Sequence, residues 1–212
     1  MIECPRIKAV IFDFGRVISS QKPVSLFRAY EDDLGLAPGT INDIMFESQA
    51  WRDALIGRSS AKEFWQAIGP ALGLESHAQI SDFRKRYHTD ESINKGVLNL
   101  IRHLHGRYKL AVLSNSPPGL ADWLSDWGIL DLFNVVYCSG DEGMLKPQPA
   151  AYNSTLKRLG TSACEAVFID DTIGHVEAAQ SLGMHGIRFT TAEQLKLELS
   201  RLLTLHDKGW TE

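Results

Sequence analysis

The sequence contains little cysteine and no long apolar run. Its three cysteines, Cys4, Cys138 and Cys164, are odd in number and form no Cys-x-x-Cys pair. They do not suit a disulfide framework, and we expect reduced thiols that pack rather than bind metal. No apolar stretch approaches the roughly 20 residues that a membrane helix requires, and residues 1–6 lack the apolar segment of a signal peptide. These absences predict a cytoplasmic protein without a membrane partner.

An excess of charge of one sign is also absent. The 22 basic and 26 acidic residues give a net charge of −4, with both signs interspersed along the chain, which argues against nucleic acid as a partner. Glycine and proline, at 17 and 8 residues, are too few for a collagen-like or disordered chain. A chain of 212 residues buries about 70% of its unfolded surface and can fold without a metal or disulfide. We expect a globular monomer or homodimer.

Three short apolar runs each end in a polar residue. They are residues 9–12 before Asp13, residues 110–113 before Ser114 and residues 166–169 before Asp170. Continuous apolar runs without alternation are typical of parallel strands that helices cover on both faces. Residues 135–138 and 186–189 are two further candidate strands, and amphipathic helical patterns separate the strands. The pattern predicts an α/β fold with a doubly wound, mostly parallel, Rossmann-like sheet.

The stretch between the first two strands has a different pattern. Residues 19–92 contain no apolar run comparable to a strand, and their apolar residues recur at helical spacing. In the rest of the chain, Ser116 followed by Pro117 is the expected start of another helix. We therefore predict an α/β core domain of residues 1–18 and 93–212, into which a helical cap domain is inserted.

The predicted strand ends place polar side chains at one edge of the sheet. In doubly wound sheets, ligands bind beyond the carboxyl ends of the strands, where Asp13, Ser114 and Asp170 are expected to meet. One such residue could start a loop or cap a helix for local reasons, but three at the same edge favour a site. Asp170 and Asp171 are adjacent, and clustered carboxylates repel unless a cation neutralises them. Mg²⁺, which prefers oxygen ligands, is the predicted cofactor.

Two further segments add groups that suit a phosphate. Ser114 and Asn115 supply a hydroxyl, an amide and backbone N–H groups near a predicted helix start, and such groups bind phosphate oxygens. Lys146 lies in a proline-rich segment before a helix and can supply a positive charge. An Asp nucleophile, a divalent cation, phosphate donors and a lysine together predict phosphoryl transfer through an aspartyl-phosphate.

Four short motifs occur in order along the chain. They are Val10-Ile11-Phe12-Asp13-Phe14-Gly15-Arg16-Val17, Leu113-Ser114-Asn115, Lys146-Pro147-x-Pro149-x-x-Tyr152 and Phe168-Ile169-Asp170-Asp171. Their order and spacing resemble the haloacid dehalogenase (HAD) superfamily, from about residue 8 to residue 189, and the helical insertion is similar to the family's C1 cap. The Asp-x-Gly-x-Val form resembles the branch of sugar-1-phosphate phosphatases. The fourth motif also resembles the phosphatase domain of soluble epoxide hydrolases.

The resemblance implies a role for each motif residue. Asp13 would attack phosphorus, and Lys146 would balance the negative charge on the nucleophile and the phosphoryl group. Ser114 and the backbone at Asn115 would hold that group. The implied Mg²⁺ ligands are the carboxylates of Asp13, Asp170 and Asp171 and the backbone carbonyl of Gly15. The implied activity is Mg²⁺-dependent hydrolysis of a small phosphorylated metabolite, for example a sugar phosphate.

Three residues depart from the family pattern. Gly15 stands where most of these phosphatases carry a second Asp as general acid and base, a role typically worth about 10²–10⁴-fold in rate. We therefore expect leaving groups that need little protonation, such as the anomeric oxygen of a sugar 1-phosphate or an acyl phosphate. Arg16 either contacts the substrate phosphate or pairs with an acid on the loop surface, and the pairing is slightly favoured. His175 is either a proton donor or a hydrogen-bonded residue in the first turn of a helix, and the second reading is favoured.

The predicted cap offers candidate substrate contacts, but no motif fixes their orientation. The candidates are Lys22, Trp51, Arg52 and Arg58. Outside the cap, Trp123 and Trp127 lie at helical spacing, and we interpret them as core or contact residues rather than as a base-stacking platform.

Two alternative functions remain open from the sequence. A metal-independent 2-haloacid dehalogenase also uses an Asp nucleophile and lacks the second Asp, but Asp170 and Asp171 would repel a departing halide. A catalytically weak member that binds phosphate or a partner protein would explain Gly15. The presence of the Asp nucleophile and the lysine speaks against this second alternative.

Overall fold

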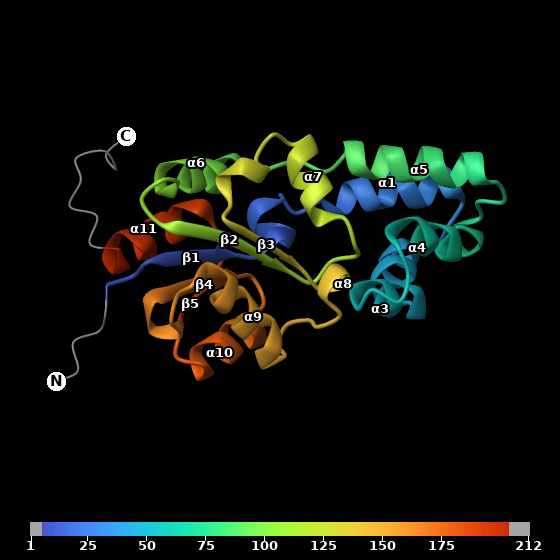
Figure 1. The fold of residues 1–212 in the computed structure, drawn as a ribbon. Coiled ribbons are helices and arrows are strands. Elements are labelled where there is room, and N and C mark those ends of the chain that lie inside the picture. Colours follow the sequence, from blue (N-terminus) through green and yellow to red (C-terminus); the bar gives the residue numbers. More distant parts are fainter. Residues whose placement is uncertain (1–5, 204–212) are drawn as a thin grey trace.

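The chain folds around one parallel sheet. The computed structural model describes residues 6–203, and the five strands in this range are all parallel, in the order β3-β2-β1-β4-β5 (Figure 1). The strands are β1 (Ala9–Phe12), β2 (Lys109–Ser114), β3 (Val135–Cys138), β4 (Ala166–Asp170) and β5 (His185–Arg188). The predicted doubly wound α/β fold is confirmed, and each strand end lies within one residue of its predicted position.

Alternate residues of the strands enter two separate cores. In β1, Val10 and Phe12 pack on one face, whereas Ala9 and Ile11 pack on the other, because successive side chains of a strand point to opposite faces. The covering helices are α6 (Lys95–Leu104), α7 (Leu120–Asp126) and α11 (Ala192–Leu202) on the first face, and α9 (Pro149–Leu159) and α10 (Ile173–Ser181) on the second (Figure 1). Both faces are therefore apolar, which explains why the strands are continuous apolar runs.

Five α-helices lie between β1 and α6 in the sequence and form the helical insertion. They are α1 (Val24–Leu34), α2 (Thr40–Asn42), α3 (Gln49–Leu55), α4 (Ala61–Ile68) and α5 (His77–Thr89). Their side chains form a hydrophobic cluster of their own, built around Tyr30, Phe64, Trp65 and Phe83, and this cluster contains no residue of the five strands. Figure 1 shows the insertion beyond the carboxyl end of the sheet.

Two short antiparallel segments join the insertion to the rest of the chain. Ser19 and Ile93 form an antiparallel bridge, and the Ser20 N–H donates to the Ser92 carbonyl at 2.7 Å. The outgoing and returning segments are thereby held side by side. The first of them follows the helical turn Phe14–Ile18 after β1, so the insertion is anchored close to the end of the central strand.

The predicted helix start at Ser116 and Pro117 is wrong. Helix α7 begins at Leu120, and the residue before it, Gly119, has a φ of 100°. Because Pro118 follows Pro117, the helical backbone conformation is disfavoured at Pro117. The chain runs on to the glycine before a helix can begin.

The three cysteines were predicted to be packing residues. Cys138 is buried in the core as expected, whereas Cys164 is exposed in a short 3₁₀ turn before β4, so the packing prediction is wrong for it. Cys4 lies outside the described residues.

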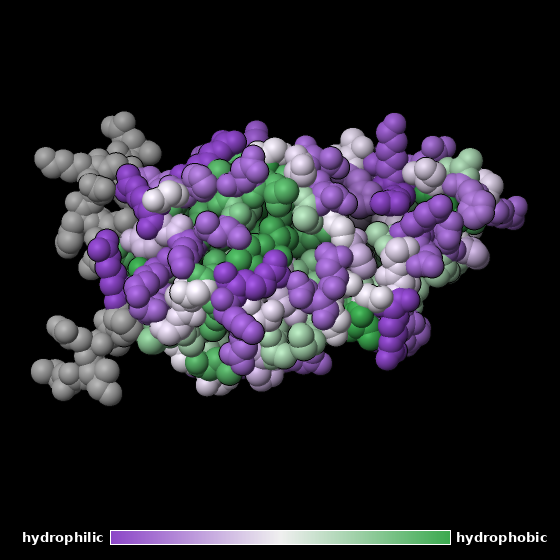
Figure 2. All heavy atoms as spheres, in the orientation of Figure 1, coloured by the Kyte–Doolittle hydropathy of each residue, from purple (hydrophilic) through white to green (hydrophobic). Residues whose placement is uncertain are grey.

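Figure 2 shows polar side chains over most of one face, with apolar atoms gathered near its middle, over the edge strand β3. No helix within residues 6–203 is both long and apolar enough to cross a lipid bilayer.

Candidate active site

The predicted strand ends do bring polar side chains together. Asp13 directly follows β1, Ser114 is the last residue of β2, and Asp170 is the last residue of β4. The parallel register places Asp13 beside both neighbours, and its backbone N–H donates to the Ile169 carbonyl at 2.8 Å. The relative exposures of Asp13, Ser114 and Asp170 are 7%, 3% and 0%. Their interactions are therefore stronger than the same interactions in water.

Lys146 reaches this edge of the sheet from the loop before α9. Its Nζ donates to Asp13 Oδ1 at 2.7 Å and to Asp170 Oδ2 at 2.6 Å, and the residue is 1% exposed. Asn115 holds the loop, because its side chain donates to the Lys146 carbonyl and accepts from the Lys146 N–H, both at 2.8 Å. The Asn115 amide, predicted to bind phosphate, is thus engaged in positioning Lys146, and its backbone N–H is the group left for a phosphate.

Burial and the charges of neighbouring side chains shift the pKa values of Asp13, Asp170 and Lys146, often in opposite directions. Burial raises the pKa of Asp13, the Lys146 ammonium lowers it and the Asp170 charge raises it, for a net value of about 6. Burial also raises the pKa of Asp170, but the hydrogen bond from His175 and the charge of Lys146 hold it below its ordinary value. Burial lowers the pKa of Lys146, but its two carboxylate partners raise it above its ordinary value. Lys146 therefore stays a cation, and Asp13 is the less well neutralised carboxylate.

Three carboxylates lie close enough to share a cation. Asp13, Asp170 and Asp171 each offer one oxygen, and these oxygens lie within 4.8 Å of one another. Asp170 already accepts hydrogen bonds on both of its oxygens. The remaining coordination capacity lies on Asp13 and Asp171, and an all-oxygen set with one or two carboxylates fits Mg²⁺.

Arg16, in the loop after the nucleophile, has a backbone conformation that is rare outside glycine. Its φ is 60°, the one positive value at a non-glycine position among the described residues, and such conformations cost about 1–3 kcal/mol. Its guanidinium lies 3.5 Å from the Asp171 carboxylate, and its backbone N–H donates to Ser19 Oγ at 3.3 Å. The pairing with an acid is the alternative that the sequence favours, but the partner is itself a candidate metal ligand.

Two residues behind the site support Asp170. His175 Nδ1 lies 3.1 Å from Asp170 Oδ2, and His175 belongs to the first turn of α10. The Tyr152 hydroxyl donates to the His175 carbonyl at 2.9 Å, and the Tyr152 ring packs edge-on against Phe168. These contacts agree with the interpretation of His175 as a hydrogen-bonded residue and of Tyr152 as a packing residue.

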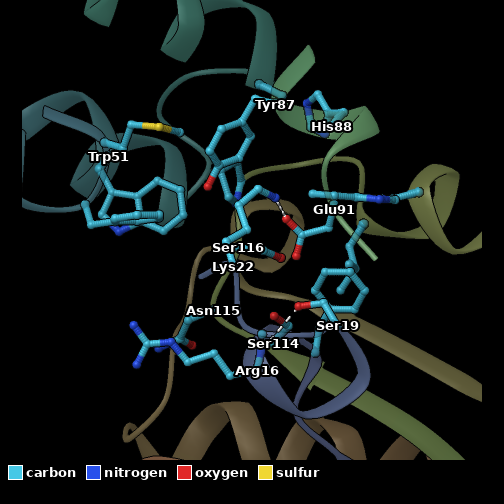
Figure 3. Close-up of a pocket in the computed structure, with 18 of the residues that line it drawn as sticks. Arg16, Ser19, Lys22, Trp51, Tyr87, His88, Glu91, Ser114, Asn115 and Ser116 are labelled. Atoms are coloured by element: carbon cyan, nitrogen blue, oxygen red, sulfur yellow. Dashed lines mark hydrogen bonds and ion pairs between the residues drawn. The ribbon is translucent and has the colours of Figure 1, made fainter. Parts of the chain in front are cut away.

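A cavity of about 1350 Å³ lies between the helical insertion and the sheet edge. Asp13, Ser114 and Lys146 line it from the core side. Figure 3 shows Arg16, Ser114 and Asn115 at one end of the cavity and Trp51, Tyr87 and His88 at the other. The Asp13 carboxylate therefore opens into a space that is walled on the opposite side by the insertion.

Two of the four candidate contacts of the insertion reach this cavity. Lys22 and Trp51 line it (Figure 3). Lys22 is buried, forms an ion pair with Glu91, and has its Nζ 4.2 Å from the centroid of the Tyr87 ring. Its charge is therefore already compensated within the wall.

The other two candidates, Arg52 and Arg58, are exposed and are not among the described residues that line the cavity. Arg52 donates to the Glu47 carbonyl at 2.7 Å, and Arg58 lies 3.4 Å from the Asp53 carboxylate. Successive residues of a helix are rotated by about 100°, so α3 cannot direct both Trp51 and Arg52 into the cavity.

The sequence did not predict the aromatic lining of the cavity. Trp65, Tyr87 and His88 line it from the insertion, and Trp123 and Trp127 line it from α7. Their helical spacing is the available signal, but spacing identifies only which residues share a face of a helix. Whether that face meets other side chains or a cavity depends on the packing of the two parts of the chain.

His88 is a titratable group within the cavity wall. Its Nε2 is buried and has no hydrogen-bond partner among the described residues, and its ring lies edge-on to Trp123, with the ring centroids 4.7 Å apart. Burial lowers the pKa of His88 to about 4, and the charges of Arg84 and Lys22 contribute to this shift. The imidazole is therefore neutral in the folded protein near pH 7.

We expect His88→Phe to reduce the sensitivity of the fold to acid. His88 has a pKa of about 6.5 in the unfolded chain and about 4 in the folded protein. Between these values the unfolded chain binds a proton that the folded protein does not bind, so the natural protein loses stability as the pH falls. Relative to the natural protein, the variant should gain about 1–2 kcal/mol between about pH 7.5 and pH 5. Urea denaturation of both proteins at the two pH values measures the difference in their free energy of unfolding. Because both proteins share every other titrating group, the pH dependence of this difference reports on His88. A difference that does not change with pH would contradict this assignment.

The fold and the site together define an α/β protein with a carboxylate-centred active site at the ends of its parallel strands. The chain belongs to the haloacid dehalogenase-like hydrolase family, whose model matches residues 7–183. It is 28% identical to the sesquiterpene phosphatase astK of Aspergillus oryzae, over 94% of this chain and 98% of that protein. It is 25% identical to the D-ribitol-5-phosphate phosphatase of Bacteroides thetaiotaomicron, over 93% and 98%.

A solved structure shares the fold. A HAD family enzyme of Bacteroides thetaiotaomicron, solved with magnesium and inorganic phosphate, superimposes with a TM-score of 0.71 at 21% identity, over 87% of this chain and 95% of that one. At this level of identity the comparison supports the architecture alone. The chain is a hydrolase of this family, and three of its carboxylates lie close enough together to hold a metal ion.

Proposed function

We propose that the chain is a Mg²⁺-dependent phosphatase that hydrolyses a small phosphate monoester through an aspartyl-phosphate. The observation that carries the proposal is the buried Asp13 carboxylate, which follows the central strand and lies 2.7 Å from the Lys146 ammonium. Two relatives that match more than nine-tenths of this chain and of their own length are a sesquiterpene phosphatase and a D-ribitol-5-phosphate phosphatase, which supports phosphoric ester hydrolysis.

The proposed reaction has two displacement steps. First, an Asp13 oxygen attacks phosphorus, the P–O bond to the alcohol breaks, and the alcohol leaves with a proton from water. Second, water attacks the phosphorus of the aspartyl-phosphate, the P–O bond to Asp13 breaks, and inorganic phosphate leaves. One water is consumed, and one alcohol and one phosphate are formed. The Ser114 hydroxyl and the Asn115 backbone N–H would donate to the phosphoryl oxygens in both steps.

Lys146 would reduce the repulsion between the nucleophile and the dianionic phosphate. Its raised pKa keeps it charged, so it would act as a fixed cation rather than as a base. Asp170 would keep the ammonium in place, since the Lys146 Nζ donates to it at 2.6 Å. Asp170 is thus assigned chiefly to the positioning of Lys146.

Asp13, Asp171 and the backbone carbonyl of Gly15 would hold the Mg²⁺, with Asp170 behind them. The bound cation supplies positive charge that offsets the charge of the phosphate oxygens. A cluster of three carboxylates speaks against the metal-independent dehalogenase alternative, because the same charges would repel a departing halide.

We also propose that residues 19–92 are a cap domain on a core domain of residues 1–18 and 93–212. The separate hydrophobic cluster of the insertion and the cavity between the two parts support this division. In such an arrangement the core would supply the chemistry and the cap would select the alcohol.

Removal of the metal tests the proposed function. The purified protein should hydrolyse an aryl phosphate in the presence of Mg²⁺, and a chelator should lower the rate by at least about 10²-fold, since the charge of the phosphate oxygens would no longer be offset. Excess Mg²⁺ should restore the rate, and the chelator loaded with Mg²⁺ beforehand is the control. Hydrolysis that resists the chelator would exclude the metal-dependent reaction.

A further inference from the structure

The cavity above the nucleophile is lined by an unusual number of aromatic side chains. All four tryptophans within residues 6–203 face it, together with phenylalanines, a tyrosine and a methionine. These lining residues are Phe14, Phe27, Met45, Phe46, Trp51, Phe64, Trp65, Tyr87, Trp123 and Trp127. They come from both sides of the cavity, from the loop after β1 and α7 in the core and from α1, α3, α4 and α5 with the turn before α3 in the insertion.

One continuous aromatic wall begins at the nucleophile. Phe14, the residue after Asp13, has its ring centroid 5.4 Å from that of Trp123 and 5.5 Å from that of Trp127. The wall continues from Trp123 to His88 at 4.7 Å and from His88 to Trp65 at 6.0 Å. An apolar surface therefore runs from the reacting carboxylate into the helical insertion.

The opposite wall is built in the same way from the insertion alone. The Trp51 ring centroid lies 5.3 Å from that of Phe46 and 5.6 Å from that of Phe64, and Phe64 lies 5.6 Å from Trp65. Trp65 thus joins the two walls. Val24, at the start of α1, also lines the cavity and is 71% exposed.

The buried polar groups of the cavity gather at the end that holds the nucleophile. Asp13, Ser19, Ser114 and Lys146 are the buried polar lining residues at this end, and further into the insertion Lys22 is paired with Glu91. A further buried acid, Glu31, accepts from the backbone N–H groups of residues 39 and 41. The other charged lining residues of the insertion are Arg28, Glu47, Lys62, Arg84 and Lys85, and all except half-buried Arg84 are exposed.

From this distribution we infer that the substrate is the phosphate monoester of a long apolar alcohol, such as an isoprenoid or fatty alcohol. This inference rests on the proposed phosphatase function and deepens it. The phosphate would lie on Asp13 and the chain along the aromatic walls, where each buried methylene raises affinity by about fourfold. His88 Nε2 is a buried polar atom of these walls without a hydrogen-bond partner among the described residues. The several hydroxyl groups of a sugar would meet few other such partners, so the cavity favours an apolar alcohol over the sugar phosphate expected from the sequence. At about 1350 Å³, the space also exceeds the roughly 300–1,000 Å³ of ordinary ligand pockets.

The chain-length profile of the natural protein tests this inference. We would measure kcat/KM with Mg²⁺ for butyl, octyl, dodecyl and farnesyl phosphate below their micelle concentrations, beside ribitol 5-phosphate and glucose 1-phosphate. Dodecyl and farnesyl phosphate should exceed butyl phosphate by at least about 100-fold, because eight added methylenes at even half the full value suffice, and they should also exceed both sugar phosphates. A flat profile, or a preference for either sugar phosphate, would overturn the inference.

The same panel separates the two proposals. Hydrolysis of an aryl phosphate with a flat chain-length profile would leave the phosphatase function intact and exclude the apolar substrate. Failure to hydrolyse any phosphate ester, aryl phosphate included, would exclude the phosphatase function itself.

Trp51→Ala locates the alcohol site. Trp51 is half-buried and lines the cavity at the end opposite Arg16 and Ser114 (Figure 3), so its truncation should lower the ratio of kcat/KM for dodecyl phosphate over butyl phosphate by about tenfold. Phe133→Ala, at a half-buried aromatic that does not line the cavity, is the matched control and should leave the ratio unchanged. Trp51→Leu, which keeps an apolar side chain, serves if the alanine variant does not fold. An equal loss on both substrates in the folded variant would contradict the placement of the chain.

Discussion

Replacing Asp13 by Asn should lower the turnover of phosphate esters by about 10⁴- to 10⁶-fold, the range typical for loss of a covalent nucleophile. The amide cannot form the aspartyl-phosphate, while its size and its place after β1 are unchanged. Stability should not fall, because burial raises the pKa of Asp13 to about 6 and its ionised form is therefore unfavourable in the folded protein near pH 7. Single-turnover and steady-state hydrolysis of an aryl phosphate, together with thermal denaturation, measure both effects.

Asp131→Asn provides the matched control for this variant. Asp131 is an exposed acid in a short 3₁₀ turn that does not line the cavity, and the same change there should alter neither turnover nor melting temperature. If Asp13→Asn retains the activity of the natural protein after rigorous purification, the activity belongs to a contaminant or Asp13 is not the nucleophile.

Replacing Lys146 by Met should cost both stability and activity. The ammonium is 1% exposed and is shared between Asp13 and Asp170, so its loss leaves two carboxylates buried without their cation. Breaking a buried ion pair in this way costs about 3–5 kcal/mol, which corresponds to a fall in melting temperature of roughly 6–20 °C for a chain of this size. Turnover should fall by about 10²–10³-fold, the usual effect of losing one electrostatic contact to the reacting group.

Calorimetry near pH 7.5 and steady-state kinetics would measure the two losses in Lys146→Met. Lys157→Met is the control, because Lys157 is exposed on α9 outside the cavity and surface changes of this kind stay within about 0.5 kcal/mol. Mg²⁺ should raise the melting temperature of Lys146→Met more than that of the natural protein, since a cation bound between Asp13 and Asp171 would replace part of the missing charge. A melting temperature within about 2 °C of the natural protein would show that the buried carboxylates do not need Lys146.

Both variants test whether the site, without a bound metal, holds more closely spaced negative charges than its cations neutralise. Two carboxylates, Asp13 and Asp170, contact Lys146, and Asp171 lies close to both of them. The guanidinium of Arg16 approaches Asp171 at 3.5 Å from a strained backbone position. Such a set is unfavourable by itself. A bound divalent cation would offset the excess of carboxylates, which is a physical reason to expect the proposed Mg²⁺ here.

The sequence by itself determined the sheet and the carboxyl-end edge of the site. A strand covered on both faces must be apolar at every position, so the runs at residues 9–12 and 166–169 identified β1 and β4, and the polar residues after them had to lie at one edge. The order and spacing of the motifs also indicated Lys146 as a candidate site residue. Nothing in the sequence of the proline-rich loop itself shows that the Lys146 ammonium reaches Asp13, as it does in the structure.

Only the tertiary structure decided which side chains face the cavity. Helical spacing shows that Trp123 and Trp127 share a face of α7, but an apolar face is required equally by a packed core and by the wall of an apolar cavity. The same ambiguity concealed the inward position of Trp51 and the outward position of Arg52 on α3. The cavity forms where two separately packed parts of the chain meet, and periodicity within one helix contains no information about that meeting.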